Sequence, residues 1–100
     1  MDYIFTEKAL EDVVKHSLQY EEAQEGLGYR FMEEVTETAK AVSKMPEGYV
    51  NLYRNTRECR TKIFPYKLIY TIEERMIYIH AVYPCKADPK KKYKNITKKK

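Results

Sequence analysis

The chain has 100 residues, of which 34% are charged, and a formal net charge of +4. That length fits one domain with a single modest hydrophobic core. The sequence has no apolar run near the roughly 20 residues of a membrane span, and its first residues lack the basic and apolar regions of a signal peptide. We therefore expect a cytoplasmic protein with no membrane partner.

The net charge conceals a difference between the two halves of the chain. Residues 1–48 hold 11 acidic and 5 basic side chains, net −6, whereas residues 49–100 hold 4 acidic and 14 basic, net +10. Such a division favours one basic surface over charges dispersed for solubility. The partner it predicts is a nucleic acid or an acidic protein segment.

The sequence contains no pattern typical of a bound metal or cofactor. Cys59 and Cys85 lie in separate predicted segments, without the close Cys and His pairing of a zinc site. We expect both to be reduced thiols, with a disulfide as the alternative. A Gly-rich phosphate loop, a Ser/His/Asp set and a cleft with paired carboxylates are also absent. We therefore predict no metal and no cofactor.

The N-terminal half predicts a short strand followed by two helices. Residues 3–5 favour the strand, and Thr6 can cap a helix over residues 7–19. That helix has a stripe that should face a sheet, formed by Leu10, Val13, Val14, Ser17 and Leu18. After Gly26-Leu27-Gly28, a second helix ends near Lys44, and its apolar face carries Phe31, Val35, Thr38, Ala39 and Val42.

From residue 49 onward the hydrophobic period changes to two. Strands are predicted over residues 49–53, 59–64, 66–73 and 76–83, with a tight turn at residues 73–75. Pro65 cannot donate to a ladder and should lie at a junction. The predicted fold is α+β, with an N-terminal helical hairpin packed on one face of a small, mainly antiparallel sheet of four to five strands. Residues 1–89 should form this domain, and residues 90–100 a basic tail that is mobile unless bound.

A cluster of cations occupies the predicted strands. Five cations lie within 14 residues, with Glu58 as the one acid among them: Arg54, Arg57, Arg60, Lys62 and Lys67. Solvated sheet faces commonly carry Lys and Arg, but this local excess favours phosphate binding, to which Arg adds bidentate geometry. Arg54, Arg57 and Lys62 are accordingly predicted to contact nucleic acid, and Arg60 and Lys67 to face outward.

The order of segments resembles the RelE/ParE toxin superfamily of bacterial type II toxin-antitoxin systems. The resemblance runs from about residue 3 to residue 89, in the segments Phe5-Thr6-Glu7-Lys8-Ala9-Leu10-Glu11-Asp12, Gly26-Leu27-Gly28-Tyr29-Arg30-Phe31, Phe64-Pro65-Tyr66, Ile77-Tyr78-Ile79-His80-Ala81-Val82-Tyr83 and Asp88-Pro89. It implies a RelE/ParE-like fold, a cognate antitoxin, a role in plasmid stabilization, and ribosome-bound mRNA or DNA gyrase as the target. The resemblance leaves open whether the protein forms homo-oligomers. We expect the antitoxin to dock on an apolar and basic surface of the sheet.

The resemblance also implies a set of catalytic residues for a metal-independent mRNA endoribonuclease. By position these are Lys67 after Tyr66, Arg60 on the preceding strand, and Tyr93 in the C-terminal segment. The superfamily's Arg after the last strand is absent, and Lys86 is the nearest cation. Cleavage by the 2′-hydroxyl needs a base, charge stabilisation at the phosphate and an acid, which such a set can supply.

Two alternatives to the ribonuclease remain at this point. One is a ParE-like inhibitor of DNA gyrase, which the Phe-Pro-Tyr motif and the missing Arg favour. The other is a non-toxic remnant that still binds an antitoxin. His16 and His80 are interpreted as structural, because a predicted helix and the last predicted strand give them no reason to meet.

Overall fold

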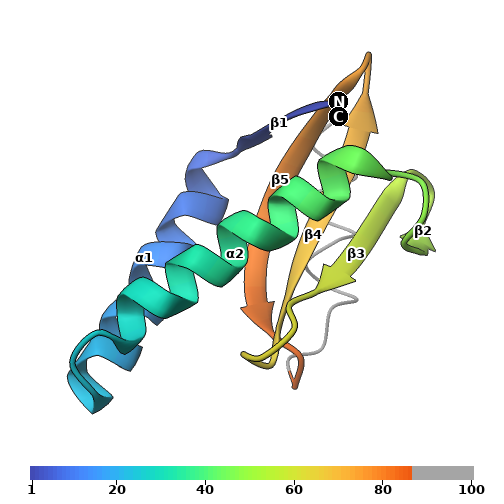
Figure 1. The fold of residues 1–100 in the computed structure, drawn as a ribbon. Helices are drawn as coiled ribbons and strands as arrows, with labels where there is room; N and C mark the ends of the chain where they lie inside the picture. Colours follow the sequence, from blue (N-terminus) through green and yellow to red (C-terminus); the bar gives the residue numbers. More distant parts are fainter. Residues whose placement is uncertain (87–100) are drawn as a thin grey trace.

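Two helices cover one face of a five-stranded sheet (Figure 1) in the computed structural model, which describes residues 1–86. The elements in chain order are β1 (Asp2–Phe5), α1 (Glu7–Ala23), α2 (Leu27–Lys44), β2 (Val50–Tyr53), β3 (Thr56–Arg60), β4 (Tyr66–Glu73) and β5 (Met76–Pro84). The predicted α+β class and helical hairpin are confirmed. The predicted tail, residues 90–100, lies outside the described residues.

The strand order across the sheet is β1-β5-β4-β3-β2. Only β1 is parallel to its neighbour, β5, and the other three pairs of strands are antiparallel. The turn between β4 and β5 holds Glu74 and Arg75 at φ of 49° and 70°, as a two-residue hairpin of the primed type requires. The two long central strands therefore come from one tight hairpin, as the sequence predicts.

The strand predicted over residues 59–64 is displaced toward the N-terminus, and β3 begins at Thr56. β3 ends at Arg60, and residues 61–65 form a loop in place of the predicted extension. The side chain of Thr61 donates a hydrogen bond to the Phe64 carbonyl, and Glu34 on α2 accepts from the backbone N–H groups of Ile63 and Phe64, each at 2.8 Å. Because side chains satisfy these backbone groups, the segment turns and does not continue the ladder.

Local contacts explain where the helices begin. Thr6 caps α1 by accepting a hydrogen bond from the backbone N–H of Ala9 at 3.2 Å. Gly26, at φ of 87°, starts α2, and Glu21 accepts from the N–H groups of Gly26 and Gly28 at 2.8 and 3.0 Å. A Cβ on Gly28 would lie only 2.4 Å from the Ser17 carbonyl oxygen, so a larger residue here would separate the two helices.

The main core lies between the helices and the sheet. At its centre is an aromatic cluster in which Phe31 contacts His16, Tyr20, Phe64 and Tyr66 with ring centroids 4.8–6.4 Å apart. Buried aliphatic residues of α1, α2, β4 and β5 surround this cluster. Aromatic pairs at this spacing add to the hydrophobic contribution of the core.

The predicted apolar stripe of α1 is only partly correct. Val13 and Ser17 are buried against the core, whereas Leu10, Val14 and Leu18 are exposed. The face of α1 that carries its smaller side chains is directed inward. α2 packs closely against this helix where Gly28 meets Ser17, and Ala9 belongs to the core between helix and sheet.

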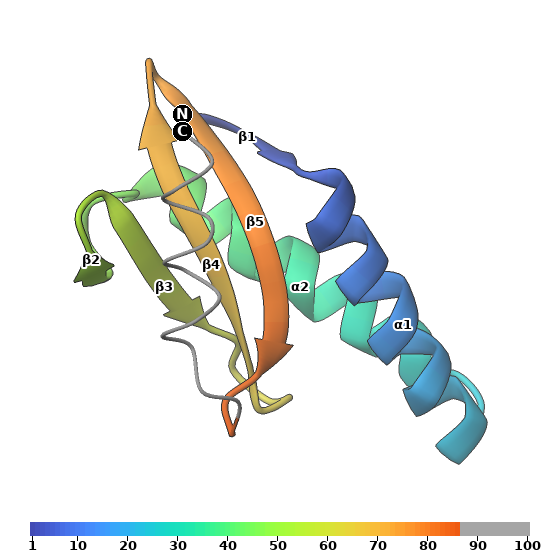
Figure 2. The same cartoon turned by 180° about the vertical axis from the view of Figure 1, so that it is seen from behind.

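The face of the sheet that the helices leave uncovered carries a second, smaller cluster. It consists of Ile69, Ala81 and Tyr83, with Leu52 and Tyr53 packed against it. Figure 2 shows this face, on which β2 to β5 lie side by side. Neither helix within residues 1–86 combines the length and the hydrophobicity of a membrane-spanning segment.

Candidate functional site

A row of three side chains crosses the uncovered face of the sheet. Arg60 on β3 is the register partner of Lys67 on β4, which in turn pairs with Tyr83 on β5. Their neighbours Cys59, Leu68 and Val82 form the next row and belong to the helix-covered core. Since side chains alternate along a strand, Arg60, Lys67 and Tyr83 point to the opposite face.

Glu58 supplies a negative charge beside this row. A Glu58 carboxylate oxygen lies 3.6 Å from Lys67 Nζ, and the other lies 4.0 Å from Arg60 Nε. Lys67 Nζ also lies 5.9 Å from the centre of the Tyr83 ring, within the range of a cation–π contact. We call these four residues, Glu58, Arg60, Lys67 and Tyr83, the charged row.

The expected exposure of Arg60 and Lys67 is correct for only one of them. Arg60 is exposed, but Lys67 is only 5% exposed. The difference follows from the strand that each occupies, because β4 lies in the middle of the sheet, between β3 and β5. A lysine there lies between its neighbours on the adjacent strands, the Tyr83 ring and the Glu58 carboxylate, and the carboxylate balances its positive charge.

The three cations predicted to contact nucleic acid do not lie together. Arg57 is on the helix-covered side of β3 and donates to the carbonyls of Glu47 and Tyr49 at 3.3 and 2.8 Å. Arg54 lies in the β2–β3 turn, at φ of 56°, with its guanidinium 5.3 Å from the centre of the Tyr53 ring. Lys62 lies in the 61–65 loop. Of these three, Arg57 therefore has a structural task, which is to hold the α2–β2 connection.

Lys86 and Tyr93 complete the residues predicted from the sequence. Lys86 is exposed and follows β5, close in sequence to Cys85, whose backbone N–H donates to the Pro65 carbonyl at 2.9 Å. This contact places the end of β5 beside the 61–65 loop, at the end of the sheet where Lys67 lies. Tyr93 lies outside the described residues, so its proposed part in the site stays a prediction.

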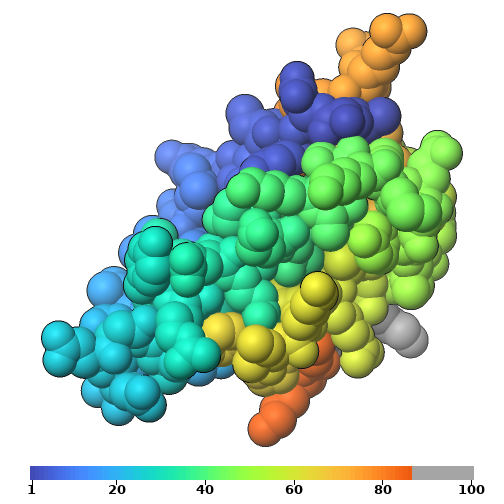
Figure 3. Space-filling model, in the orientation of Figure 1, coloured from blue at the N-terminus to red at the C-terminus, as the bar shows by residue number. Residues whose placement is uncertain are grey.

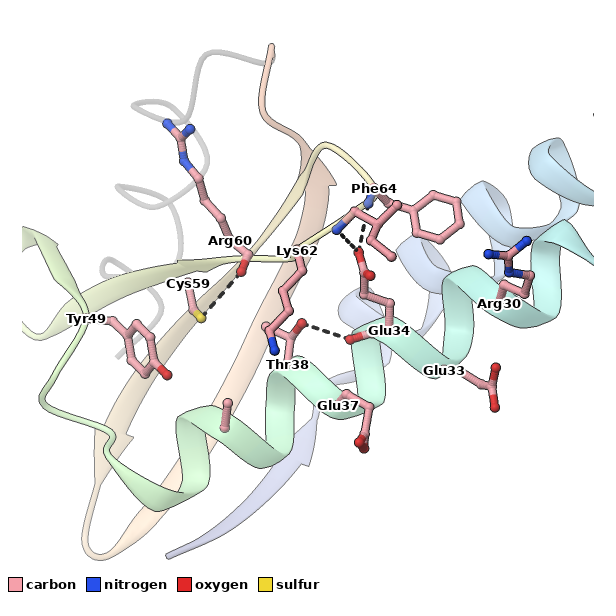
Figure 4. A pocket seen from close by; sticks show the side chains of 12 residues that line it. Arg30, Glu33, Glu34, Glu37, Thr38, Tyr49, Cys59, Arg60, Lys62 and Phe64 are labelled. Atoms are coloured by element: carbon pink, nitrogen blue, oxygen red, sulfur yellow. Dashed lines mark hydrogen bonds between the residues drawn. The ribbon is translucent and has the colours of Figure 1, made fainter.

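A cavity of about 810 Å³ lies on the other side of β3, between α2 and the 61–65 loop (Figure 4). Lys62 points toward α2, whereas the Arg60 guanidinium points away from the helices. Tyr49 and Cys59 also line the cavity, and burial raises the pKa of the Cys59 thiol and of the Tyr49 hydroxyl. A thiol with a raised pKa is a poor nucleophile at neutral pH, which argues against covalent chemistry at this cavity.

The two histidines have separate hydrogen-bond partners. His16 Nδ1 lies 3.0 Å from the Tyr66 hydroxyl in the core, and His80 Nε2 lies 2.8 Å from the Thr71 hydroxyl on the sheet. Burial raises the pKa of Tyr66 to about 12, so this hydroxyl stays protonated at neutral pH. These contacts support the interpretation of both histidines as structural.

Comparison with known proteins identifies the family. The family model for the ParE toxin of the type II toxin-antitoxin system parDE matches residues 3–89. The chain belongs to this family. As a ParE-type toxin of a type II toxin-antitoxin system, it also falls within the superfamily that its sequence resembles. No curated protein matches the sequence.

Solved structures have the same fold. The chromosomal ParDE toxin-antitoxin system from P. aeruginosa contains a chain that aligns with a TM-score of 0.75 at 15% identity, over 84% of this toxin and 95% of that chain. A chain of the intact E. coli RelBE toxin-antitoxin complex aligns with a TM-score of 0.63 at 15% identity, over 87% of this toxin and 96% of that chain. The isolated E. coli RelE toxin aligns with a TM-score of 0.62 at 14% identity, over 98% of this toxin and 96% of that chain. At these identities the likeness shows the fold and not the target.

Sequence reasoning missed Glu58 and Tyr83 as members of the charged row. Glu58 precedes Arg60 by two positions, so strand periodicity alone places both on one face. The contact with Lys67 and Tyr83 depends on the register of β3, β4 and β5, which the amino-acid pattern does not define. The sequence therefore contained enough information to place Glu58 beside Arg60, but not enough to place Tyr83 beside Lys67.

Proposed function

We propose that this ParE-type toxin inhibits DNA gyrase by binding it and does not cleave mRNA. The observation that carries the proposal is the state of Lys67, the lysine that matches the catalytic position of the ribonucleases. Its ammonium is buried and lies 3.6 Å from the Glu58 carboxylate. A phosphate would have to compete with that carboxylate to reach it.

The charges of the row argue in the same direction. Stabilising a crowded phosphate in RNA cleavage requires a local excess of cations aimed at the reacting atoms. Glu58, Arg60 and Lys67 together carry one net positive charge, and only Arg60 presents its cation to solvent. The Arg that follows the last strand in the ribonucleases is replaced by Cys85-Lys86. The family model, which is that of ParE, also supports gyrase as the target.

One observation favours the ribonuclease as a second candidate. The Glu58 carboxylate lies within 4.0 Å of both the Arg60 guanidinium and the Lys67 ammonium. A carboxylate can act as general base for a 2′-hydroxyl, and a neighbouring guanidinium can stabilise the phosphate. If RNA cleavage occurs, Glu58 and Arg60 are the described residues that would perform it.

We further propose that a cognate antitoxin docks on the uncovered face of the sheet. That face combines the apolar cluster around Ile69 and Tyr83 with the exposed guanidinium of Arg60. β2 forms an edge of the same sheet, and Val50 on it is 59% exposed. An edge strand beside apolar and basic side chains suits an extended segment with acidic residues.

A paired variant separates the two candidate functions. Glu58→Gln with Lys67→Met removes the ion pair and keeps the shape of both side chains. We expect this variant to inhibit gyrase supercoiling as the wild type does, while reporter mRNA in expressing cells stays intact by primer extension. Cuts within codons that appear with the wild type and disappear with the variant would establish the ribonuclease instead.

A further inference from the structure

An apolar ridge runs along the outer side of α1. Leu10, Val14 and Leu18 are 52%, 54% and 60% exposed and follow one another at intervals of four residues. Side chains at this spacing lie on one face of a helix. We call these three residues the α1 ridge.

The α1 ridge continues toward α2. Gly28 touches α1 at Ser17, and Met32 on α2 lies one turn after Gly28 and is 45% exposed. Met32 therefore borders the seam between the two helices on its outer side, next to the α1 ridge. Figure 3 shows that α1 and α2 form one continuous surface on this side of the molecule.

The fold does not require these exposed side chains. The core face of α1 consists of Ala9, Val13, His16 and Ser17, and its contact with the sheet is reinforced by Asp12, which accepts from the Val82 N–H at 2.9 Å. Large apolar side chains placed together at a helix surface, without a packing role, mark interaction sites more often than solitary ones do.

The border of the α1 ridge is acidic. Glu7, Glu11 and Glu22 are exposed on the same helix and fall within one turn of ridge residues. They outnumber the one exposed cation beside them, Lys15, because Lys8 is already paired with Asp12 at 2.7 Å. The first 48 residues as a whole carry a net charge of −6. A second copy of this chain would bring the same negative border against its own, which like-charge repulsion disfavours.

We propose that the α1 ridge docks an amphipathic helix of a partner protein, with an apolar face flanked by Lys and Arg. Apolar residues at i, i+3, i+4 and i+7 of the partner would pack between Leu10, Val14 and Leu18 by ridges-into-grooves packing. Basic flanks would then lie opposite Glu7, Glu11 and Glu22. The charged row and the proposed antitoxin contact lie on the other face of the sheet, so this surface is independent of both.

A synthetic helical peptide tests the proposal on the full chain. The probe is a fluorescein-labelled peptide with Leu at i, i+3, i+4 and i+7 and Lys flanks, and its counterpart has Glu in place of each Lys. We expect the Lys peptide to bind and the Glu peptide not to. Leu10→Gln, Val14→Gln and Leu18→Gln together should weaken binding of the Lys peptide by about tenfold or more, because they remove the central apolar contacts.

A matched control removes exposed apolar side chains elsewhere. Val50→Gln with Ile63→Gln lowers the surface hydrophobicity away from α1, and this variant should bind the peptide within about twofold of the wild type. Amide chemical shifts should change along α1 and at Met32 on addition of the Lys peptide. If the triple variant does not fold, Leu18→Lys alone should show the same loss of binding.

Three results would overturn the proposal. The first is equal peptide binding by the wild type and the α1 ridge variant, and the second is a set of shift changes centred on the charged row. The third is a wild-type dimer in sedimentation that the ridge substitutions dissociate, because a second copy would then be the occupant.

Discussion

The two faces of the sheet are stabilised by different kinds of contact. On the helix-covered face, Phe31 and Tyr66 belong to a packed aromatic cluster, and their positions follow from hydrophobic burial. On the uncovered face, a smaller apolar cluster lies beside a buried ion pair between Glu58 and Lys67. The difference shows that a lysine in a strand does not by itself indicate a phosphate-binding site. Its neighbours on the adjacent strands must also be known.

The largest effect is expected where the covered face is most tightly packed. Phe31→Ala should reduce the free energy of unfolding by about 4 kcal/mol, since it leaves a cavity among four aromatic rings. Urea denaturation measures this loss. Tyr29→Ala, on the same helix but 65% exposed, should change the free energy by less than about 0.5 kcal/mol. Equal losses in the two variants would contradict the proposed core.

The next effect tests the uncovered face. Glu58→Gln should cost roughly 3 kcal/mol of unfolding free energy, because it leaves the buried Lys67 ammonium without its counter-charge. Adding Lys67→Met should recover most of that loss, since the unpaired charge is then gone. Urea denaturation of the two single variants, the double variant and the exposed control Glu74→Gln completes the measurement. No recovery in the double variant would show that the two side chains are not coupled.

A smaller effect is expected at the loop that joins β3 to β4. Glu34→Ala removes the acceptor of two backbone hydrogen bonds to Ile63 and Phe64 and should cost about 2 kcal/mol. The loop amides should also exchange faster with deuterium. Glu33→Ala, an exposed neighbour on α2, is the control and should leave both quantities unchanged. Unaltered exchange at Ile63 in the Glu34 variant would mean that the loop is held by other contacts.

The smallest effect concerns one hydrogen bond in the core and depends on pH. Tyr66→Phe removes the bond to His16 and should cost about 1 kcal/mol near neutral pH. The folded-state pKa of Tyr66, about 12, exceeds its ordinary value of 10, so its protonated form contributes stability that is lost as pH rises from 10 to 12.

The wild type should therefore lose stability over that range more steeply than Tyr66→Phe, and the difference between them should shrink. Thermal unfolding followed across pH 9–12 provides the measurement. A difference that grows with pH would contradict the assigned shift. Tyr70, whose pKa burial also raises, is present in both proteins and cancels in the comparison.

The sequence predicts the fold better than it predicts the candidate site. Helical spacing and the change to period two give the elements of the hairpin and sheet, since burial imposes these patterns directly. The rotation of α1 was missed, because Val13 and Val14 are equally apolar and only the close approach at Gly28 decides which faces inward.

The site depends on relations that no local pattern encodes. Arg57 and Arg60 are equivalent as residues in a basic segment, but alternation places them on opposite faces of β3. Arg57 donates hydrogen bonds to backbone carbonyls, whereas Arg60 is exposed beside Glu58. The burial of Lys67 requires the strand order across the sheet, with β4 in the middle, which the sequence pattern leaves undetermined.

The proposal that this toxin acts on gyrase by binding is tested most directly with the purified chain in a supercoiling assay. Increasing amounts of toxin should inhibit supercoiling of relaxed plasmid by DNA gyrase, and the same preparation should leave mRNA intact on translating ribosomes. Unaffected supercoiling together with cleavage of ribosome-bound mRNA would contradict the account and assign the charged row to RNA cleavage.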